Sequence, residues 1–235
     1  MKIPLILLIA GVALLLCQGC ANPPSASGPP ESFDGTKSHF ARFGTNRVHY
    51  LTAGNGQPVI VFVHGWSCNA TFWREQVPVF GDKARLILID LIGHGQSDKP
   101  EAYYSMDFLA SSVLAVLSQE HVSRAILVGH SMGVAVICRV HAQAPEKVAA
   151  LVAVDGFLRT RRLPRDQSEK FIAPYRRTDY REHVKRSISS MFPNPGTEAL
   201  RDRVLSDILV TPQHVMVSMG KARGTQASQL GTWRM

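Results

Sequence analysis

Gly129-His130-Ser131-Met132-Gly133 is the segment of this 235-residue chain whose residue types and spacing could do nucleophilic chemistry. It fits the pattern G-x-S-x-G, in which a serine occupies a sharp turn between a strand and a helix. A buried apolar run ends at Val128, and a helix-like stretch begins at Met132. The two glycines matter because side chains there would collide where the chain doubles back. We therefore expect the Ser131 hydroxyl to project from the edge of a sheet as a nucleophile, above a helix N-terminus. The alternative is a serine at a tight turn of a nucleotide-binding fold.

A second segment could stabilise the negative charge that such a nucleophile creates on a carbonyl oxygen. His64-Gly65-Trp66 directly follows the apolar run Val59 to Val63. The backbone N–H groups of Trp66 and Met132 could converge on that oxygen as an oxyanion hole, each contributing about 3 kcal/mol. His64 is either a catalytic base or a residue that holds this loop by hydrogen bonds. We favour the second role, because a base must reach Ser131 from a later loop.

The elements that must position these residues follow from the pattern of apolar residues. Runs without polar alternation are typical of strands buried on both faces of a parallel sheet. An alternating pattern over 39–51 predicts an antiparallel hairpin, and Ser105 can cap a helix. The order of strands and helices predicts an α/β fold with a doubly wound, mostly parallel sheet. The expected buried strands are 59–63, 86–89, 125–128 and 148–154, with helices after 105 and over 132–144.

Composition excludes several other classes of protein. The chain has a formal net charge of +8, with 45% hydrophobic and 19% charged residues. These values indicate a soluble globular domain and argue against disorder and against a membrane protein with several spans. Two of the four cysteines lie at the N-terminus, so the remaining two, Cys68 and Cys138, cannot form a disulfide framework or a zinc cluster. Nothing in the sequence indicates a metal, flavin or nucleotide cofactor.

The first 35 residues are expected to be an export signal and a tether. Lys2 precedes an apolar run of fourteen residues, which is too short to span a bilayer and is typical of a signal peptide over 1–19. Gly19-Cys20 resembles the end of a bacterial lipobox, in which the cysteine is acylated. Residues 20–35 are rich in proline and serine, as a spacer would be. We expect a lipoprotein anchored through Cys20 in the cell envelope; a secreted protein with a cleaved signal is the alternative.

The stretch after Gly156 is strongly basic and differs from the part before it. Between Arg159 and Arg186 it contains ten lysines and arginines and four acidic residues. Mixed helical segments interrupted by prolines predict a helical cap over 158–217. The basic surface is either a solvated face or a surface for anionic lipid or an acidic substrate. Nucleic acid is not an expected partner, because no groove-reading motif accompanies the charges.

Together these motifs resemble the α/β-hydrolase family, in the branch with esterases, haloperoxidase-like enzymes, epoxide hydrolases and haloalkane dehalogenases. Besides the turn at Ser131 and the loop 64–66, residues 90–97 resemble the family's D-x-x-G-x-G-x-S loop, and 72–76 resemble its first helix. The resemblance covers 39–157 and implies that 36–157 form the N-terminal part of the hydrolase core. Asp90 and Ser97 are expected to fix a turn. Because the turn carries serine, the resemblance favours hydrolysis of small acyl or ester substrates through an acyl-enzyme, without a cofactor.

The resemblance also implies an acid and a histidine after Ser131, and these are not apparent. His141 lies ten residues along the following helix, about 15 Å away, and cannot reach back. His183 and His214 lie in the cap region and follow no buried strand. Asp155 directly follows the strand 148–154, and it is either the acid or a turn residue before Gly156.

Residues 218–235 contain no Asp, Glu or His and show no strand pattern. We therefore expect the fold to lack its last one or two strands, and we interpret this tail as out-of-frame translation. Three functions stay open: a serine hydrolase, a catalytically inactive truncated hydrolase, and a non-catalytic acyl-binding lipoprotein.

Overall fold

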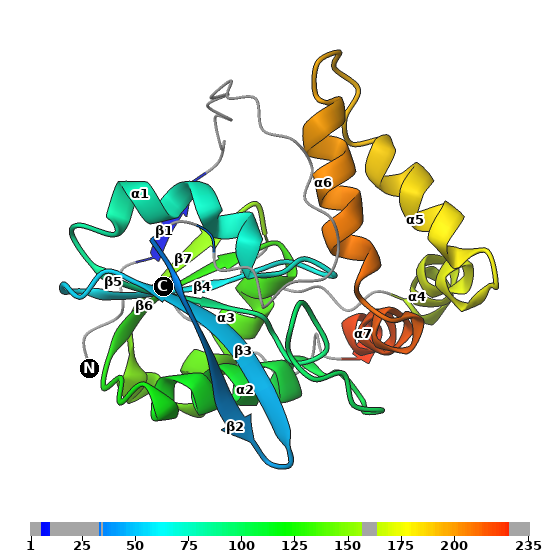
Figure 1. Ribbon diagram of the computed structural model, residues 1–235. Coiled ribbons are helices and arrows are strands. Elements are labelled where there is room, and N and C mark those ends of the chain that lie inside the picture. Colours follow the sequence, from blue (N-terminus) through cyan, green and yellow to red (C-terminus); the bar gives the residue numbers. More distant parts are fainter. Residues whose placement is uncertain (1–5, 10–32, 34, 157–163, 226–235) are drawn as a thin grey trace.

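A twisted sheet between two layers of helices forms the main body of the protein (Figure 1). The computed structural model describes residues 6–9, 33, 35–156 and 164–225. In this part of the chain the sheet has seven strands in the order β1-β7-β6-β4-β5-β3-β2. β2 and β3, and β3 and β5, are antiparallel, whereas the remaining neighbours are parallel. The strands are β1 Ile6–Ile9, β2 Lys37–Phe43, β3 Asn46–Ala53, β4 Val59–Val63, β5 Arg85–Ile89, β6 Ala125–His130 and β7 Val148–Val154.

Both faces of the central strands are buried, which confirms the prediction from their continuous apolar runs. In β4, Val61 and Val63 belong to the core cluster on the side of the long helices α2 and α3, whereas Phe62 belongs to the cluster on the other side. The long helices are α2 Met106–Gln119, capped by the Ser105 side chain as predicted, and α3 Met132–Gln143. The opposite face is covered by the 3-10 helix η1 Ala70–Gln76 and the short α1 Val77–Phe80. The short 3-10 helix η2 Pro145–Lys147 leads into β7.

The predicted helical cap is a group of helices to one side of the sheet, on the right of Figure 1. Its contact with the core is made partly by Val215 and Met219, which are buried among core residues. None of the described helices is long and apolar enough to cross a membrane. The cap consists of α4 Arg165–Ile172, the 3-10 helix η3 Ala173–Arg176, α5 Tyr180–Ser189, α6 Glu198–Leu209 and α7 Gln213–Thr225.

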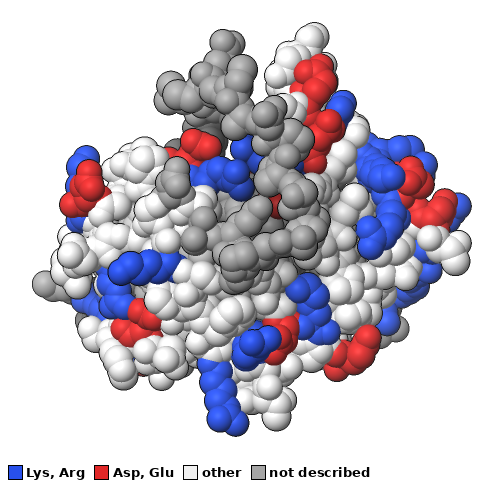
Figure 2. Space-filling model, in the orientation of Figure 1, with Lys and Arg blue, Asp and Glu red and all other residues white. Residues whose placement is uncertain are grey.

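The basic residues of the cap are largely interspersed with acidic ones, as Figure 2 shows on the same side of the molecule. Four ion pairs join neighbouring cap residues: Arg176–Glu169, Arg177–Asp179, Lys185–Glu182 and Arg201–Asp202. Each pair is at least partly exposed, so its contribution to stability is small. These pairs favour the solvated face over a dedicated anion-binding surface. Arg159, Arg161 and Arg162 lie outside the described residues.

Two described segments bear on the domain boundaries expected near the two ends of the chain. Ile6–Ile9, in the expected signal peptide, form β1 and pair in parallel with β7 at the edge of the sheet. An apolar run of isoleucine and leucine suits an edge strand as well as a signal peptide, so the prediction over 1–19 stays untested. The boundary expected between 217 and 218 falls inside α7, where Met219 and Ala222 are buried. Cys20, most of the tether and residues 226–235 lie outside the described residues.

Candidate active site

Ser131 occupies the sharp turn between β6 and α3. Its φ of 52° and ψ of −115° lie outside the helical and strand regions, which is a strained conformation for a residue other than glycine. A Cβ atom at Gly129 would lie 2.5 Å from the carbonyl oxygen of Gly133, and one at Gly133 would lie 2.4 Å from that of Val63. Both glycines are therefore required by contact with backbone. The predicted turn is confirmed, and the catalytic role of Ser131 stays a prediction.

The Ser131 side chain is exposed and borders the loop between β4 and η1. The backbone around it is held by hydrogen bonds: its N–H donates to the carbonyl oxygen of Val154 at 3.0 Å, and its carbonyl accepts from Val134 N–H at 3.1 Å. A Cβ atom at Gly65 would lie 3.3 Å from the Cβ of Ser131. The serine therefore lies next to the loop 64–66, as the sequence predicts.

The two expected oxyanion donors are backbone amides near this serine. Met132 is the first residue of α3, and the first amides of a helix have no acceptor within the helix. Trp66 follows Gly65 in the loop that borders Ser131. Within the described residues neither amide has a hydrogen-bond acceptor. Neither amide is therefore engaged elsewhere in this part of the chain, and their role as oxyanion donors stays a prediction.

His64 holds the loop rather than acting as a base. Leu91 N–H donates to its Nε2 at 3.0 Å, so the proton is on Nδ1, which donates to the Gly65 carbonyl oxygen at 2.7 Å. The ring is fully buried, and burial lowers the pKa of His64 to about 4. Both nitrogens of this neutral ring are engaged and not free to take the proton of Ser131, so the structural role of His64 stays our prediction.

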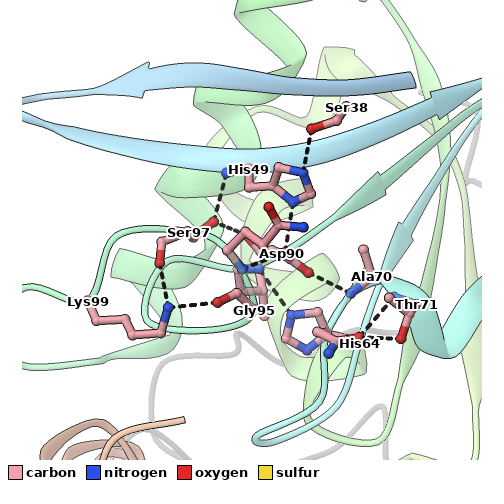
Figure 3. Close-up of polar contacts among 12 residues, drawn as sticks. Ser38, His49, His64, Ala70, Thr71, Asp90, Gly95, Ser97 and Lys99 are labelled. Carbon is pink, nitrogen blue, oxygen red and sulfur yellow. Dashed lines mark hydrogen bonds and ion pairs between the residues drawn. The ribbon is translucent and has the colours of Figure 1, made fainter. Parts of the chain in front are cut away.

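Asp90 joins three segments beneath the loop (Figure 3). Its carboxylate accepts hydrogen bonds from Ala70 N–H at 2.6 Å, Gln96 N–H at 2.8 Å and His49 Nδ1 at 2.8 Å. Ser97 Oγ donates to the Asp90 carbonyl oxygen at 2.6 Å. These contacts fix the turn after β5 and the start of η1, which is the role predicted for Asp90 and Ser97.

The carboxylate of Asp90 is ionised although it is buried. Burial alone would raise its pKa, but the hydrogen bond and charge of His49 and the Gln96 amide together hold the pKa of Asp90 below its usual value. A buried carboxylate with three donors is a rigid anchor, because breaking one contact leaves a charge poorly solvated. The anchor fixes η1 and therefore the C-terminal end of the loop that carries Trp66.

Asp155 lies close to the turn but has no downstream histidine as a partner. It directly follows β7, is exposed and has a φ of 44°. A Cβ atom at the next residue, Gly156, would lie 2.7 Å from the Ser131 carbonyl oxygen. Burial lowers the pKa of His130, and the charge of Asp155 partly opposes this. Asp155 therefore acts on His130, which lies inside the motif itself.

The histidines after Ser131 are engaged elsewhere. His183 packs edge-on against Tyr175, with ring centroids 5.0 Å apart, and its Nε2 lies 3.5 Å from Ser187 Oγ. His214 Nδ1 lies 3.4 Å from a carboxylate oxygen of Glu101. His141 lies in α3, beyond reach of the turn. Among the described residues, none forms a hydrogen bond with the Ser131 hydroxyl, so the structure places no base at the candidate nucleophile.

Several cap residues contact the loop that carries Trp66, and no pattern in the sequence predicts these contacts. The Trp66 ring packs against Phe171 and Tyr175, and Asp207 accepts a hydrogen bond from Thr71. These partners are more than 100 residues apart in the chain, so no local pattern could predict them. Among the described residues there is also no group of three His, Cys, Asp or Glu side chains that could hold a metal ion.

The order of strands and the serine turn define an α/β hydrolase, and comparison of sequences agrees. The sequence profile of the alpha/beta hydrolase fold family matches residues 58–195, and the chain belongs to this family. Epoxide hydrolase 1 of Caenorhabditis elegans is 32% identical over 126 residues, which cover 52% of this chain and 31% of that protein. The chain spans about a third of the length of the first curated relatives it matches.

Solved structures show the same fold. An esterase from Exiguobacterium antarcticum matches with a TM-score of 0.72 at 20% identity, over 80% of this chain and 74% of that one. An esterase from a Rhodococcus species matches with a TM-score of 0.65 at 29% identity, over 79% of this chain and 72% of that one. The predicted fold class is therefore confirmed, and the protein is similar to hydrolases of more than one specificity.

Proposed function

We propose that the protein is a serine hydrolase that cleaves carboxylic ester bonds of small acyl substrates. The observation that carries the proposal is the strained turn at Ser131, whose exposed side chain borders the loop with the Trp66 amide. The epoxide hydrolases and dehalogenases that the motifs resemble carry aspartate at this turn, whereas the serine here favours ester chemistry. Likeness to the Rhodococcus esterase supports the same specificity.

In this proposal Ser131 Oγ attacks the carbonyl carbon, and the Trp66 and Met132 amides bind the oxygen that becomes negative. A base takes the serine proton and passes it to the leaving alcohol oxygen as the C–O bond breaks, and an acyl-enzyme remains. Water then hydrolyses the acyl-enzyme, which releases the carboxylic acid product and restores the serine. Asp155 is the candidate for the acidic residue of the catalytic site. The base is the unassigned member, because His183 and His214 are engaged with other residues.

Labelling with a fluorophosphonate probe tests the proposal. The probe phosphonylates a serine only where the hydroxyl is activated and the phosphoryl oxygen is bound. The wild type is expected to label and Ser131→Ala is expected not to label. Ser123→Ala, an exposed serine on the turn before β6, serves as the matched control and should label like the wild type. An unlabelled wild type that is folded would contradict the proposal.

A second candidate is a protein without turnover, either an inactive hydrolase or an acyl-binding lipoprotein. The engagement of both cap histidines away from Ser131 favours it. Without a base, a serine hydrolase keeps only the contributions of the oxyanion hole and substrate binding, a rate about 10³-fold over water. Binding of a fatty acid that is unchanged in Ser131→Ala, together with no labelling, would support this candidate.

We further propose that the protein is exported and anchored to the membrane through Cys20. The basic Lys2, the short apolar run, Gly19-Cys20 and the proline-rich spacer support this proposal. Incorporation of radioactive palmitate should be lost in Cys20→Ala and kept in Cys17→Ala. Equal incorporation in both variants would contradict acylation at Cys20, and a wild type without incorporation would favour a secreted protein.

A further inference from the structure

The cap contacts the loop between β4 and η1 through an apolar cluster. The Trp66 ring lies 5.5 Å from the Phe171 ring of α4 and 4.7 Å, edge-on, from the Tyr175 ring of η3, measured between centroids. Trp66 also packs against the cluster that contains Ile208 and Met216 of α6 and α7. The residue whose amide is the proposed oxyanion donor is therefore held through its side chain by the cap.

A polar contact from α6 reaches the same loop a few residues further on. The Thr71 hydroxyl lies 3.2 Å from Asp207 Oδ2, in the last turn of α6, and 2.7 Å from Asn69 Oδ1. The Asn69 side chain also faces Asp207 and opposes the rise in the pKa of its carboxyl. Next to this contact, Thr211 Oγ1 lies 3.4 Å from the Ser67 carbonyl oxygen. The cap thus makes hydrogen bonds at the end of the loop as well as apolar contacts at Trp66.

The loop needs such support because its backbone is strained. Ser67, next to Trp66, has a φ of 58°, in the left-handed region that favours glycine. It is also buried, and its hydroxyl has no hydrogen-bond partner in the described structure. A strained residue keeps its conformation only where the surrounding contacts over-determine it. If the cap contacts were weakened, the loop would relax, and the Trp66 amide would change direction.

We propose that Asp207 is a positioning residue for the oxyanion hole: from the cap helix α6 it holds, through Thr71 and Asn69, the loop that carries the Trp66 amide. The inference rests on the proposed function, because it takes that amide as the oxyanion donor. In this arrangement the cap is part of the catalytic machinery as well as a cover. Docking of the cap and assembly of the oxyanion hole are then one event.

The surroundings of Asp207 distinguish this role from ordinary stabilisation. Burial raises the pKa of Asp207, and the groups that face it oppose this only in part. A folded-state pKa above the unfolded value means that stability falls as pH rises through that interval, because the folded state disfavours the ionised form. A neutral residue of the same shape should therefore leave stability unchanged or raise it. The facing groups are Asn69, Thr71 through its hydrogen bond, Arg74 and Arg203 by charge, and the Cys68 thiol.

Hydrogen exchange of the backbone amides in 65–72 tests the link in the whole protein. Asn at 207 keeps one acceptor but presents an NH₂ group to a neighbouring donor, so one hydrogen bond is lost. We expect these amides to exchange about tenfold faster in Asp207→Asn, with an unchanged or higher melting temperature. Thr71→Val should have a similar effect, and the double variant should add little because both changes break one contact. Asp202→Asn, exposed on the same helix, is the control.

The rate of Ser131 phosphonylation at saturating probe tests the consequence for chemistry. We expect Asp207→Asn to lower this rate about tenfold, without changing the probe concentration that gives half the maximal rate, because the amide acts on the developing charge. Unchanged exchange in 65–72 with normal labelling would overturn the inference alone. A melting temperature that falls in proportion to the labelling rate would also overturn it, in favour of a structural role. A wild type that never labels would overturn the proposed function and, with it, the oxyanion part of the inference.

Discussion

Replacing Gly133 by alanine tests whether the serine turn depends on backbone contact. The added Cβ would lie 2.4 Å from the carbonyl oxygen of Val63 and 2.7 Å from that of His64. Carbon and oxygen atoms normally approach to about 3.3 Å. The start of α3 would therefore have to move away from β4 by almost 1 Å. Because the atoms in contact are backbone, no side chain can yield.

The expected loss of stability is compared with that at a glycine which is required only for its positive φ. Overpacking a core costs about 1–3 kcal/mol, and more where backbone must shift. We therefore expect Gly133→Ala to lower the free energy of unfolding by about 3 kcal/mol. Gly44→Ala is the control: its φ is 61° and nothing lies within 4 Å of the added atom. A left-handed alanine costs about 1–2 kcal/mol.

Urea unfolding followed by circular dichroism measures both variants, and fluorophosphonate labelling reports the turn itself. Gly133→Ala should unfold at lower urea than Gly44→Ala and lose labelling, whereas Gly44→Ala should label normally. If Gly133→Ala unfolded within about 1 kcal/mol of the wild type and still labelled, α3 would not pack against β4 as described, and the structural basis for the nucleophile would be refuted.

Three further substitutions probe the neighbourhood of the turn. Gly65→Ala places a Cβ 3.0 Å from His130 Nδ1 and 3.3 Å from Ser131 Cβ, so side chains must shift slightly. We expect the free energy of unfolding to fall by about 1 kcal/mol and fluorophosphonate labelling to become at least tenfold slower. A labelling rate that falls only in proportion to the loss of folded protein would contradict this. Asp90→Asn removes a buried carboxylate that accepts three hydrogen bonds and should cost about 3 kcal/mol at pH 7. Because the folded pKa of Asp90 lies below the ordinary 3.8, this stability is present above that value and is lost as pH falls through the folded pKa, so acid titration of unfolding should bring the two proteins together. Trp73→Phe should change the free energy of unfolding by less than about 1 kcal/mol in urea, because the lost ring area is offset by removal of a buried Nε1 that has no partner in the described structure; a cost of 3 kcal/mol would reveal a missing hydrogen bond.

The strands and the serine turn could be predicted because each has a local cause. A strand buried on both faces must be apolar throughout, so 59–63 and 125–128 are visible in the sequence. Ser105 caps α2 through its own side chain, which is again a contact between neighbours. The glycines beside Ser131 are required by clashes within the same turn and with the adjacent strand.

The extent of α7 could not be predicted from local preferences. Residues 213–225 include two glycines and two threonine or serine residues, which are poor helix formers. The helix is nevertheless continuous across 217, because Met219 and Ala222 are buried against the rest of the protein. Ser218 adds hydrogen bonds to Tyr104 N–H and the Ala102 carbonyl oxygen. Tertiary packing outweighs helix propensity here, and no residue pattern within 213–225 predicts this packing.

The same reasoning explains why no catalytic base is assigned to Ser131. Ser131 and the residues of the two amides follow strands β4 and β6. These strands are neighbours in the sheet, so the pairing of the strands positions both segments. A base must come from another element, and its position depends on contacts over long separations, like those between Asp207 and Thr71. Asp155 is exposed and directly follows β7, and it stays the candidate acidic residue and not the proton acceptor of Ser131.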